Sequence, residues 1–204
     1  MKSNTLPQKF YKRDTSKVAK ELLGKLLIRK LKNKTLIGKI VETEAYYGLK
    51  DPSSRAFTTP KMAQPMWNDP GTTFIYMVHN NWLLNVITEK KGIPAAVLIR
   101  ALEPLAEIEI MKKHRKKGSF LISNGPGKLT HALKIGKRHN SINVFEPWSE
   151  LKIINLLKQK KFKISSSNRV GVKYDLKKEL RFYIKDNPWV SKGQIYGEFK
   201  LPKK

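Results

Sequence analysis

Two carboxylates and an aromatic ring stand at alternate positions of one short segment. Glu42, Glu44 and Tyr46 all belong to the string Val-Glu-Thr-Glu-Ala-Tyr. If this segment is a strand, its side-chain period of two places the three residues on one face, which a core strand would not bury together. A carboxylate can deprotonate water and offset positive charge that develops on a reacting group, and an aromatic face can hold a planar ligand. Glu44 is therefore a candidate general base beside a candidate stacking surface, Tyr46.

Other segments offer partners for this pair. Tyr76, from a separate expected strand, could complete an aromatic slot, and Arg100 could hold a phosphate or an attacking water. Glu42 is interpreted as an ion-paired supporting carboxylate in preference to a catalytic one. From residue types alone, Tyr46 and Tyr76 are also compatible with ordinary sheet aromatics, so two interpretations stay open at this point.

The elements expected to position these residues begin with a short helix over residues 16–23, capped by Thr15 or Ser16. Two strands over 26–31 and 35–47 follow as a hairpin. The second strand is expected to place one set of side chains on a common face, namely Leu36, Ile40, Glu42, Glu44 and Tyr46. Residues 48–71 are rich in Pro, Ser, Thr and Asp and predict a long ordered loop, a feature that is often functional.

The remaining chain predicts further short elements. Residues 72–78 form a strand with Phe74, Tyr76 and Val78 on one face and Ile75, Met77 and His79 on the other. A strand over 93–102 delivers Arg100, and Pro104 is expected to open a helix. The other expected elements are a loop before a helix over 128–133, a strand or helix over 151–158, a strand over 180–184 and a turn over 187–189. Strands and helices alternate without a βαβ rhythm, which favours a single α+β domain over 1–204 with a mainly antiparallel, curved β-sheet flanked by short helices.

The composition indicates the kind of binding partner and argues against disulfides and metal sites. The 42 Lys and Arg outnumber the 16 Asp and Glu, giving a formal net charge of +26, which favours a polyanion, foremost a nucleic acid. Lysine enrichment with merely solvated charges is the alternative. There is no cysteine, and the four histidines lack paired spacing, so neither a disulfide nor a protein-held metal is expected. No apolar stretch resembles a signal peptide or a membrane span, and we expect an intracellular protein, cytoplasmic or nucleoid-associated, or nuclear in a eukaryote.

Five strings occur in the order found in one known family. They are Val-Glu-Thr-Glu-Ala-Tyr (41–46), Pro-Gly-Thr (70–72), Arg-Ala-Leu-Glu-Pro (100–104), Gly-Pro-Gly-Lys-Leu (125–129) and Asn-Pro-Trp-Val-Ser (187–191). Together they resemble the alkyladenine DNA glycosylases, also called mammalian-type 3-methyladenine DNA glycosylases. The resemblance runs over residues 14–191. Five ordered strings are a strong signal, whereas each alone would be weak.

This resemblance implies a role for several residues. Glu44 matches the family's general base, and Arg100 matches the arginine that helps to hold the nucleophilic water and the target nucleotide. Val170 matches the residue whose main-chain carbonyl also contacts that water. Tyr46 and Tyr76 match the two tyrosines that sandwich the flipped base.

Three further positions concern substrate choice. Asn85 matches the pocket asparagine that crowds the exocyclic amine of normal guanine. Arg55 stands where the family often has a pocket histidine, and His79 stands where the family has a wedge tyrosine that fills the gap left by the flipped base. An Arg55 that faces inward would repel cationic alkylated purines and favour neutral lesions such as hypoxanthine. An Arg55 that turns outward would bind a phosphate instead. For His79 we expect intercalation with a less persistent flipped state.

The resemblance implies a monofunctional DNA glycosylase that flips out and hydrolyses alkylated or deaminated purines of the 3-methyladenine and hypoxanthine class. The expected partner is duplex DNA with a damaged purine, the expected state is a monomer, and no cofactor or metal is needed. No lysine occupies a motif position typical of a Schiff-base nucleophile, so strand cleavage is not expected. The alternatives are a non-catalytic RNA-binding module and a metal-dependent nuclease. Activity in excess chelator separates all three.

Overall fold

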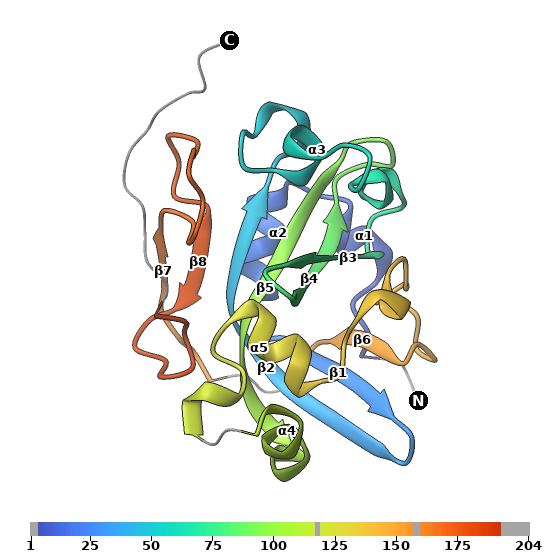
Figure 1. Ribbon diagram of the computed structural model, residues 1–204, viewed down its shortest axis with the longest axis vertical. Helices are drawn as coiled ribbons and strands as arrows, with labels where there is room; N and C mark the ends of the chain where they lie inside the picture. Colours follow the sequence, from blue (N-terminus) through green and yellow to red (C-terminus); the bar gives the residue numbers. More distant parts are fainter. Residues whose placement is uncertain (1–3, 117–118, 157–159, 193–204) are drawn as a thin grey trace.

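One antiparallel β-sheet organises the molecule. The computed structural model describes residues 4–116, 119–156 and 160–192. Eight strands within these residues form a sheet in the order β3-β4-β5-β2-β1-β6, and β8 joins β2 while β7 pairs with β8. Their bounds are β1 Leu26–Leu31, β2 Lys34–Tyr46, β3 Thr73–Val78, β4 Asn81–Thr88, β5 Ala95–Ala106, β6 Leu151–Ile154, β7 Ile164–Ser167 and β8 Arg181–Ile184. Figure 1 shows the β7–β8 hairpin at the left, alongside β2. The predicted α+β class with a mainly antiparallel sheet is confirmed.

Short helices flank the sheet. They are α1 Gln8–Tyr11, α2 Thr15–Leu22, α3 Arg55–Thr58, α4 Ile108–Arg115 and α5 Pro126–Ala132, with 3-10 turns η1 Gly48–Lys50, η2 Gln64–Trp67, η3 Ser119–Ile122 and η4 Lys137–His139. The N-cap of α2 is Asp14, whose carboxylate accepts from the amide of Lys17 at 2.9 Å. The prediction of Thr15 or Ser16 as the cap was wrong, because both lie inside the first turn. No described helix is long and apolar enough to cross a membrane.

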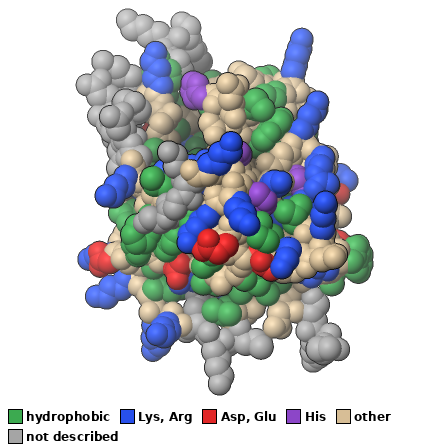
Figure 2. All heavy atoms as spheres, turned by 60° about the horizontal axis from the view of Figure 1, so that its bottom comes forward, with side chains coloured by type: hydrophobic (Ala, Val, Ile, Leu, Met, Phe, Trp, Pro, Cys, Tyr) green, Lys and Arg blue, Asp and Glu red, His purple; other side chains and the backbone are tan. Residues whose placement is uncertain are grey.

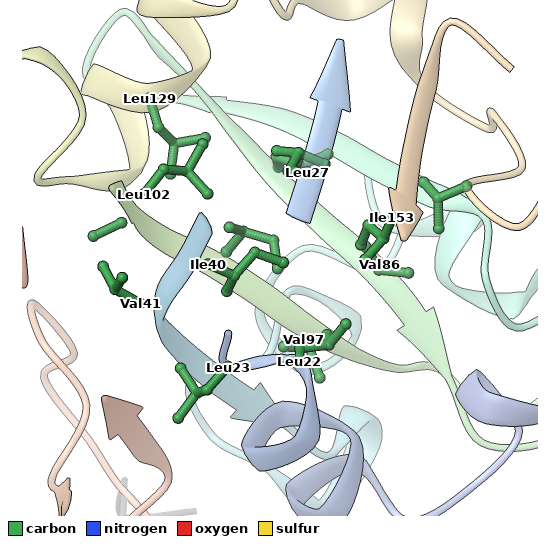
Figure 3. Close-up of a cluster of buried hydrophobic side chains, with 14 of the residues drawn as sticks. Leu22, Leu23, Leu27, Ile40, Val41, Val86, Val97, Leu102, Leu129 and Ile153 are labelled. Atoms are coloured by element: carbon green, nitrogen blue, oxygen red, sulfur yellow. The ribbon is translucent and has the colours of Figure 1, made fainter. Parts of the chain in front are cut away.

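The main hydrophobic core combines both kinds of element. Leu22 of α2, Leu102 of β5 and Leu129 of α5 are almost fully buried in one apolar cluster (Figure 3). Burying a leucine side chain stabilises the fold by roughly 1.5–3 kcal/mol. The helices are therefore fixed to the sheet by packing, which gives the strand that carries Glu44 a rigid support.

Three register shifts lie where β2 meets β5, and two of them are bulges on either side of Glu42. Ile40 pairs with Leu102 and Glu42 pairs with Ala101, so Val41 is an extra residue on β2. Because Leu102 and Ala101 are consecutive, they lie on opposite faces of the sheet, and so do Ile40 and Glu42. The prediction that Leu36 and Ile40 share a face with Glu42 and Glu44 was therefore wrong. The two carboxylates and Tyr46 do stay together.

The second bulge involves Arg100. Glu42 pairs with Ala101 while Thr43 pairs with Ile99, which leaves Arg100 without a direct partner on β2. Bulges redirect side chains and are common beside functional sites. Here the bulge turns Arg100 toward the two carboxylates of β2.

Other predictions differ from the structure. Pro104 lies within β5 opposite Gly38, beside a register shift, and α4 begins only at Ile108. A proline is tolerated there because the irregular register removes the need for its missing N–H. Strands β4 and β7 were not predicted. The expected loop over 48–71 contains η1, α3 and η2, and the strand-or-helix over 151–158 is β6, with residues 157–158 outside the described residues.

Candidate active site

A pocket of about 750 Å³ opens beside the polar end of β2. Segments far apart in sequence form its wall: the end of β2, the α3 region, the β3–β4 hairpin, the part of β5 around Arg100, the start of α5 and the loop after β7. The lining residues used below are Tyr46, Arg55, Tyr76, His79, Arg100, Lys128 and Val170. Six of these seven residues were predicted site residues, and the structure brings them together around one pocket. Lys128 is the one that was not predicted.

Glu44 lies directly behind this wall and is fully buried. Its Oε2 accepts from the Tyr46 hydroxyl at 2.8 Å and from Arg100 Nη1 at 3.2 Å, and its Oε1 accepts from the Val170 amide at 2.7 Å. All three donors line the pocket. A carboxylate with charge-assisted bonds of this kind is held in one orientation, and each oxygen has two acceptor positions, so Oε1 retains one that a water could use.

Val170 meets Glu44 through a different atom from the expected one. The resemblance assigns its main-chain carbonyl to a water, whereas the structure shows its N–H donating to Glu44. The carbonyl's contact with water stays a prediction. The N–H contact adds a backbone anchor that the sequence did not indicate.

Arg100 joins Glu44 to the second carboxylate. Its Nε donates to Glu42 Oε1 at 2.9 Å. Burial alone lowers the pKa of Arg100, but the Glu44 and Glu42 carboxylates outweigh it and raise that pKa above its ordinary value, so the guanidinium stays charged. Glu42 also accepts from Arg181 Nε at 2.7 Å and from the hydroxyl and amide of Ser191 at 2.8 and 2.7 Å. These are the contacts of a supporting, ion-paired carboxylate.

The Tyr46 ring is backed by an arginine that sequence reasoning missed. The guanidinium carbon of Arg169 lies 4.4 Å from the ring centroid. Arg169 is fully buried, bonds Asp51 at 2.6 and 2.8 Å and Asp175 at 2.6 Å, and also donates to the Ala45 carbonyl at 3.0 Å. The signal was present in the sequence, because Arg169 directly precedes Val170 and Asp51 lies four residues before Arg55. What the sequence could not indicate is that the chain brings these residues together.

Tyr76 forms another part of the pocket wall. Its ring stacks on Phe74 with centroids 5.0 Å apart, and the Arg55 guanidinium carbon lies 4.9 Å from the Tyr76 centroid. Arg55 begins α3, where the Ser54 hydroxyl accepts from the Ala56 amide. Of the two orientations left open by the sequence, the structure has the inward one.

Asn85 lies beside the pocket but does not line it. It is 3% exposed, and its amide donates to the carbonyls of Phe74 at 3.1 Å and Leu83 at 3.4 Å. Its side chain therefore holds backbone within the sheet. The expected contact between Asn85 and a purine amine stays a prediction.

His79 stands at the tip of the β3–β4 hairpin. His79 and Asn80 have φ values of 45° and 59°, the two left-handed residues of a tight hairpin turn. The side-chain Nδ2 of Asn81 donates to the His79 carbonyl at 2.7 Å. A Cβ on Gly127 would lie 2.6 Å from the Asn81 side chain, so the start of α5 supports the turn closely. Strand alternation ends at Val78, and for this reason His79 lines the same pocket as Tyr76, contrary to the expected separation.

The surroundings of the site are basic. Lys128 lines the pocket, and its ammonium donates to Asn124 Oδ1 at 2.8 Å. Figure 2 shows Lys and Arg side chains spread over the face that comes forward, with fewer acidic ones, in keeping with the net charge of +26. Among the described residues, no group of three His, Cys, Asp or Glu could hold a metal ion.

The buried Tyr46 hydroxyl is expected to make the free energy of unfolding depend on pH in the alkaline range. Burial, and then the Glu44 charge, raise the pKa of Tyr46 well above its ordinary value. The folded chain therefore keeps a proton that the unfolded chain releases above a pH of about 10, so the free energy of unfolding should fall as pH rises through that range. Urea unfolding at several alkaline pH values should show a smaller decline for Tyr46→Phe than for the wild type. Equal declines would show that this phenol is not linked to folding.

Comparisons with known proteins identify the family to which the chain belongs. The family model described as methylpurine-DNA glycosylase (MPG) matches residues 9–188. A Clostridium perfringens (strain 13 / Type A) protein, named as an inferred 3-methyladenine DNA glycosylase, is 42% identical over 92% of this chain and 98% of its own length. Proteins of the same name from Clostridium tetani and Francisella tularensis are each 40% identical, over 92% and 87% of this chain and 98% and 94% of their own lengths. The chain belongs to the methylpurine-DNA glycosylase family, whose members are hydrolases that act on N-glycosyl bonds in DNA.

Proposed function

We propose that the chain flips a damaged purine out of duplex DNA into the pocket between Tyr46 and Tyr76 and hydrolyses its glycosidic bond with Glu44 as general base. The observation that carries the proposal is the Glu44 carboxylate, fully buried and bonded to three donors that all line the pocket. A general base needs such a fixed position beside a space where the reacting atom can lie.

The proposed reaction uses each of these groups. A water that donates to Glu44 Oε1 attacks the anomeric carbon as the bond to the base breaks. The carboxylate takes the water's proton and offsets the positive charge on the sugar. Arg100, bonded to Glu42 and Glu44, holds Glu44 in place and is a candidate contact for the target nucleotide. The tyrosine rings stack on the extruded base, and His79 fills the gap in the duplex.

The proposed substrates are alkylated and deaminated purines, including hypoxanthine. The proposal includes hydrolysis without strand cleavage and action as a monomer.

The test is base release from duplexes that each carry one defined lesion, followed in excess chelator. The expected result is release of free base that leaves an abasic site in an intact strand. A nuclease would lose its activity in chelator, and a binding module would show neither activity, so either outcome would contradict the proposal.

A further inference from the structure

The three arginines around the stacking tyrosines differ in whether a carboxylate is paired with them. Arg100 is paired with Glu42 and Glu44, and Arg169 is paired with Asp51 and Asp175. Arg55 also lines the pocket, yet within the described residues no carboxylate lies within ion-pair distance of its guanidinium. Its contact is the Tyr76 ring, 4.9 Å away. Arg55 is therefore the guanidinium of this pocket whose charge remains free to act on a bound ligand.

We propose that Arg55 is a specificity-determining residue that stabilises the departing base when the lesion is a neutral purine and opposes the binding of purines that are already cationic. This inference rests on the proposed function, because it concerns a base stacked beside Tyr76. An arginine keeps its proton under all working conditions, so the positive charge is permanent.

The chemistry of the leaving group differs between the two lesion classes. When the bond between C1′ and N9 breaks, its electron pair goes to N9, water oxygen bonds to C1′, and the water's proton goes to Glu44. A neutral purine such as hypoxanthine thereby gains negative charge, which a neighbouring guanidinium stabilises, and it later takes a proton from solvent. A purine methylated at N3 or N7 starts as a cation and leaves as a neutral molecule. The guanidinium gives that departure no help and repels the bound cation.

Water screens the repulsion between Arg55 and a cationic purine less in this pocket than it would on the protein surface. Tyr76 lies against a small buried cluster that includes Phe74 and Ala56, and Arg55 begins the helix that supplies Ala56. Interactions between charges grow as water is excluded, and a stacked base would exclude more of it. One side chain is thus placed to affect the two lesion classes in opposite directions.

The test is an Arg55→Met variant, assayed under single-turnover conditions with saturating enzyme on duplexes that contain hypoxanthine or 7-methylguanine. The hypoxanthine rate should fall on the order of 10-fold or more, while the 7-methylguanine rate stays level or rises. Arg13→Met removes an equal charge from the surface, away from the pocket, and should leave the ratio of the two rates unchanged. Thermal melting of each variant checks the fold, and Arg55→Lys should retain part of the hypoxanthine rate.

Equal losses for both lesions, or a greater loss for 7-methylguanine, would overturn the role of Arg55. Glu44→Gln, assayed in parallel, separates this failure from that of the proposed function. If Glu44→Gln is inactive and Arg55→Met leaves the ratio unchanged, the inference about Arg55 alone is wrong. If Glu44→Gln excises both bases at the wild-type rate, the proposed function is wrong.

Discussion

Replacing Glu44 with glutamine is expected to lower the single-turnover rate of base release by about 10³-fold or more, at unchanged affinity for lesion-containing DNA within a few fold. The glutamine side chain would have nearly the same shape and could still accept from the Val170 amide, which bonds Glu44 at 2.7 Å. It could not take a proton from water. Because Arg100 keeps its bond to Glu42, the variant should also remain folded.

The matched control is Glu21→Gln. Glu21 is an exposed carboxylate paired with Arg13 on the surface, so its loss changes the net charge equally without touching the pocket. Rates should match the wild type for this control. A Glu44→Gln rate within tenfold of the wild type would mean that another group activates the water.

Arg169→Met is expected to have the largest effect on stability, lowering the free energy of unfolding by about 3–5 kcal/mol. Asp51 is fully buried and Asp175 nearly so, and both depend on this guanidinium for compensation. Removing it leaves buried carboxylates uncompensated and removes the support behind the Tyr46 ring, 4.4 Å away. Urea denaturation monitored by tryptophan fluorescence measures the change.

Arg13→Met provides the comparison for this prediction. Arg13 makes an ion pair with Glu21 in which both side chains are at least 36% exposed. Exposed ion pairs contribute about 0–1 kcal/mol to the free energy of unfolding, so Arg169→Met should destabilise the fold clearly more than Arg13→Met. If Arg169→Met costs no more than Arg13→Met, the buried cluster does not stabilise the fold as its geometry indicates.

Local patterns in the sequence predicted much of the fold. Strand β1 was predicted with its observed bounds, because its apolar run is closed by a clear turn signal. The fold class followed from the irregular alternation of strands and helices. Strand β4 was missed because its buried residues form a continuous run at one end, so the strand lacks the period of two.

Part of the candidate site could also be predicted from the sequence, but for a different physical reason from the one that applies to the fold. Glu44 and Tyr46 could be paired because their spacing within one strand fixes their side, whatever happens elsewhere. The extra residue at Val41 could not be foreseen, since a bulge depends on how two strands meet. Arg169 was missed for the same reason, because its partner Asp51 is 118 residues away along the chain. Contacts of this kind exist only once the chain has folded.

The most direct measurement is a structure of the Glu44→Gln variant bound to a duplex that contains one hypoxanthine. The account predicts the base outside the helix, stacked against Tyr46 and Tyr76, with the anomeric carbon facing the side chain of residue 44 across a single water. A hypoxanthine that remains stacked in the duplex, or a sugar that lies away from residue 44, would contradict it.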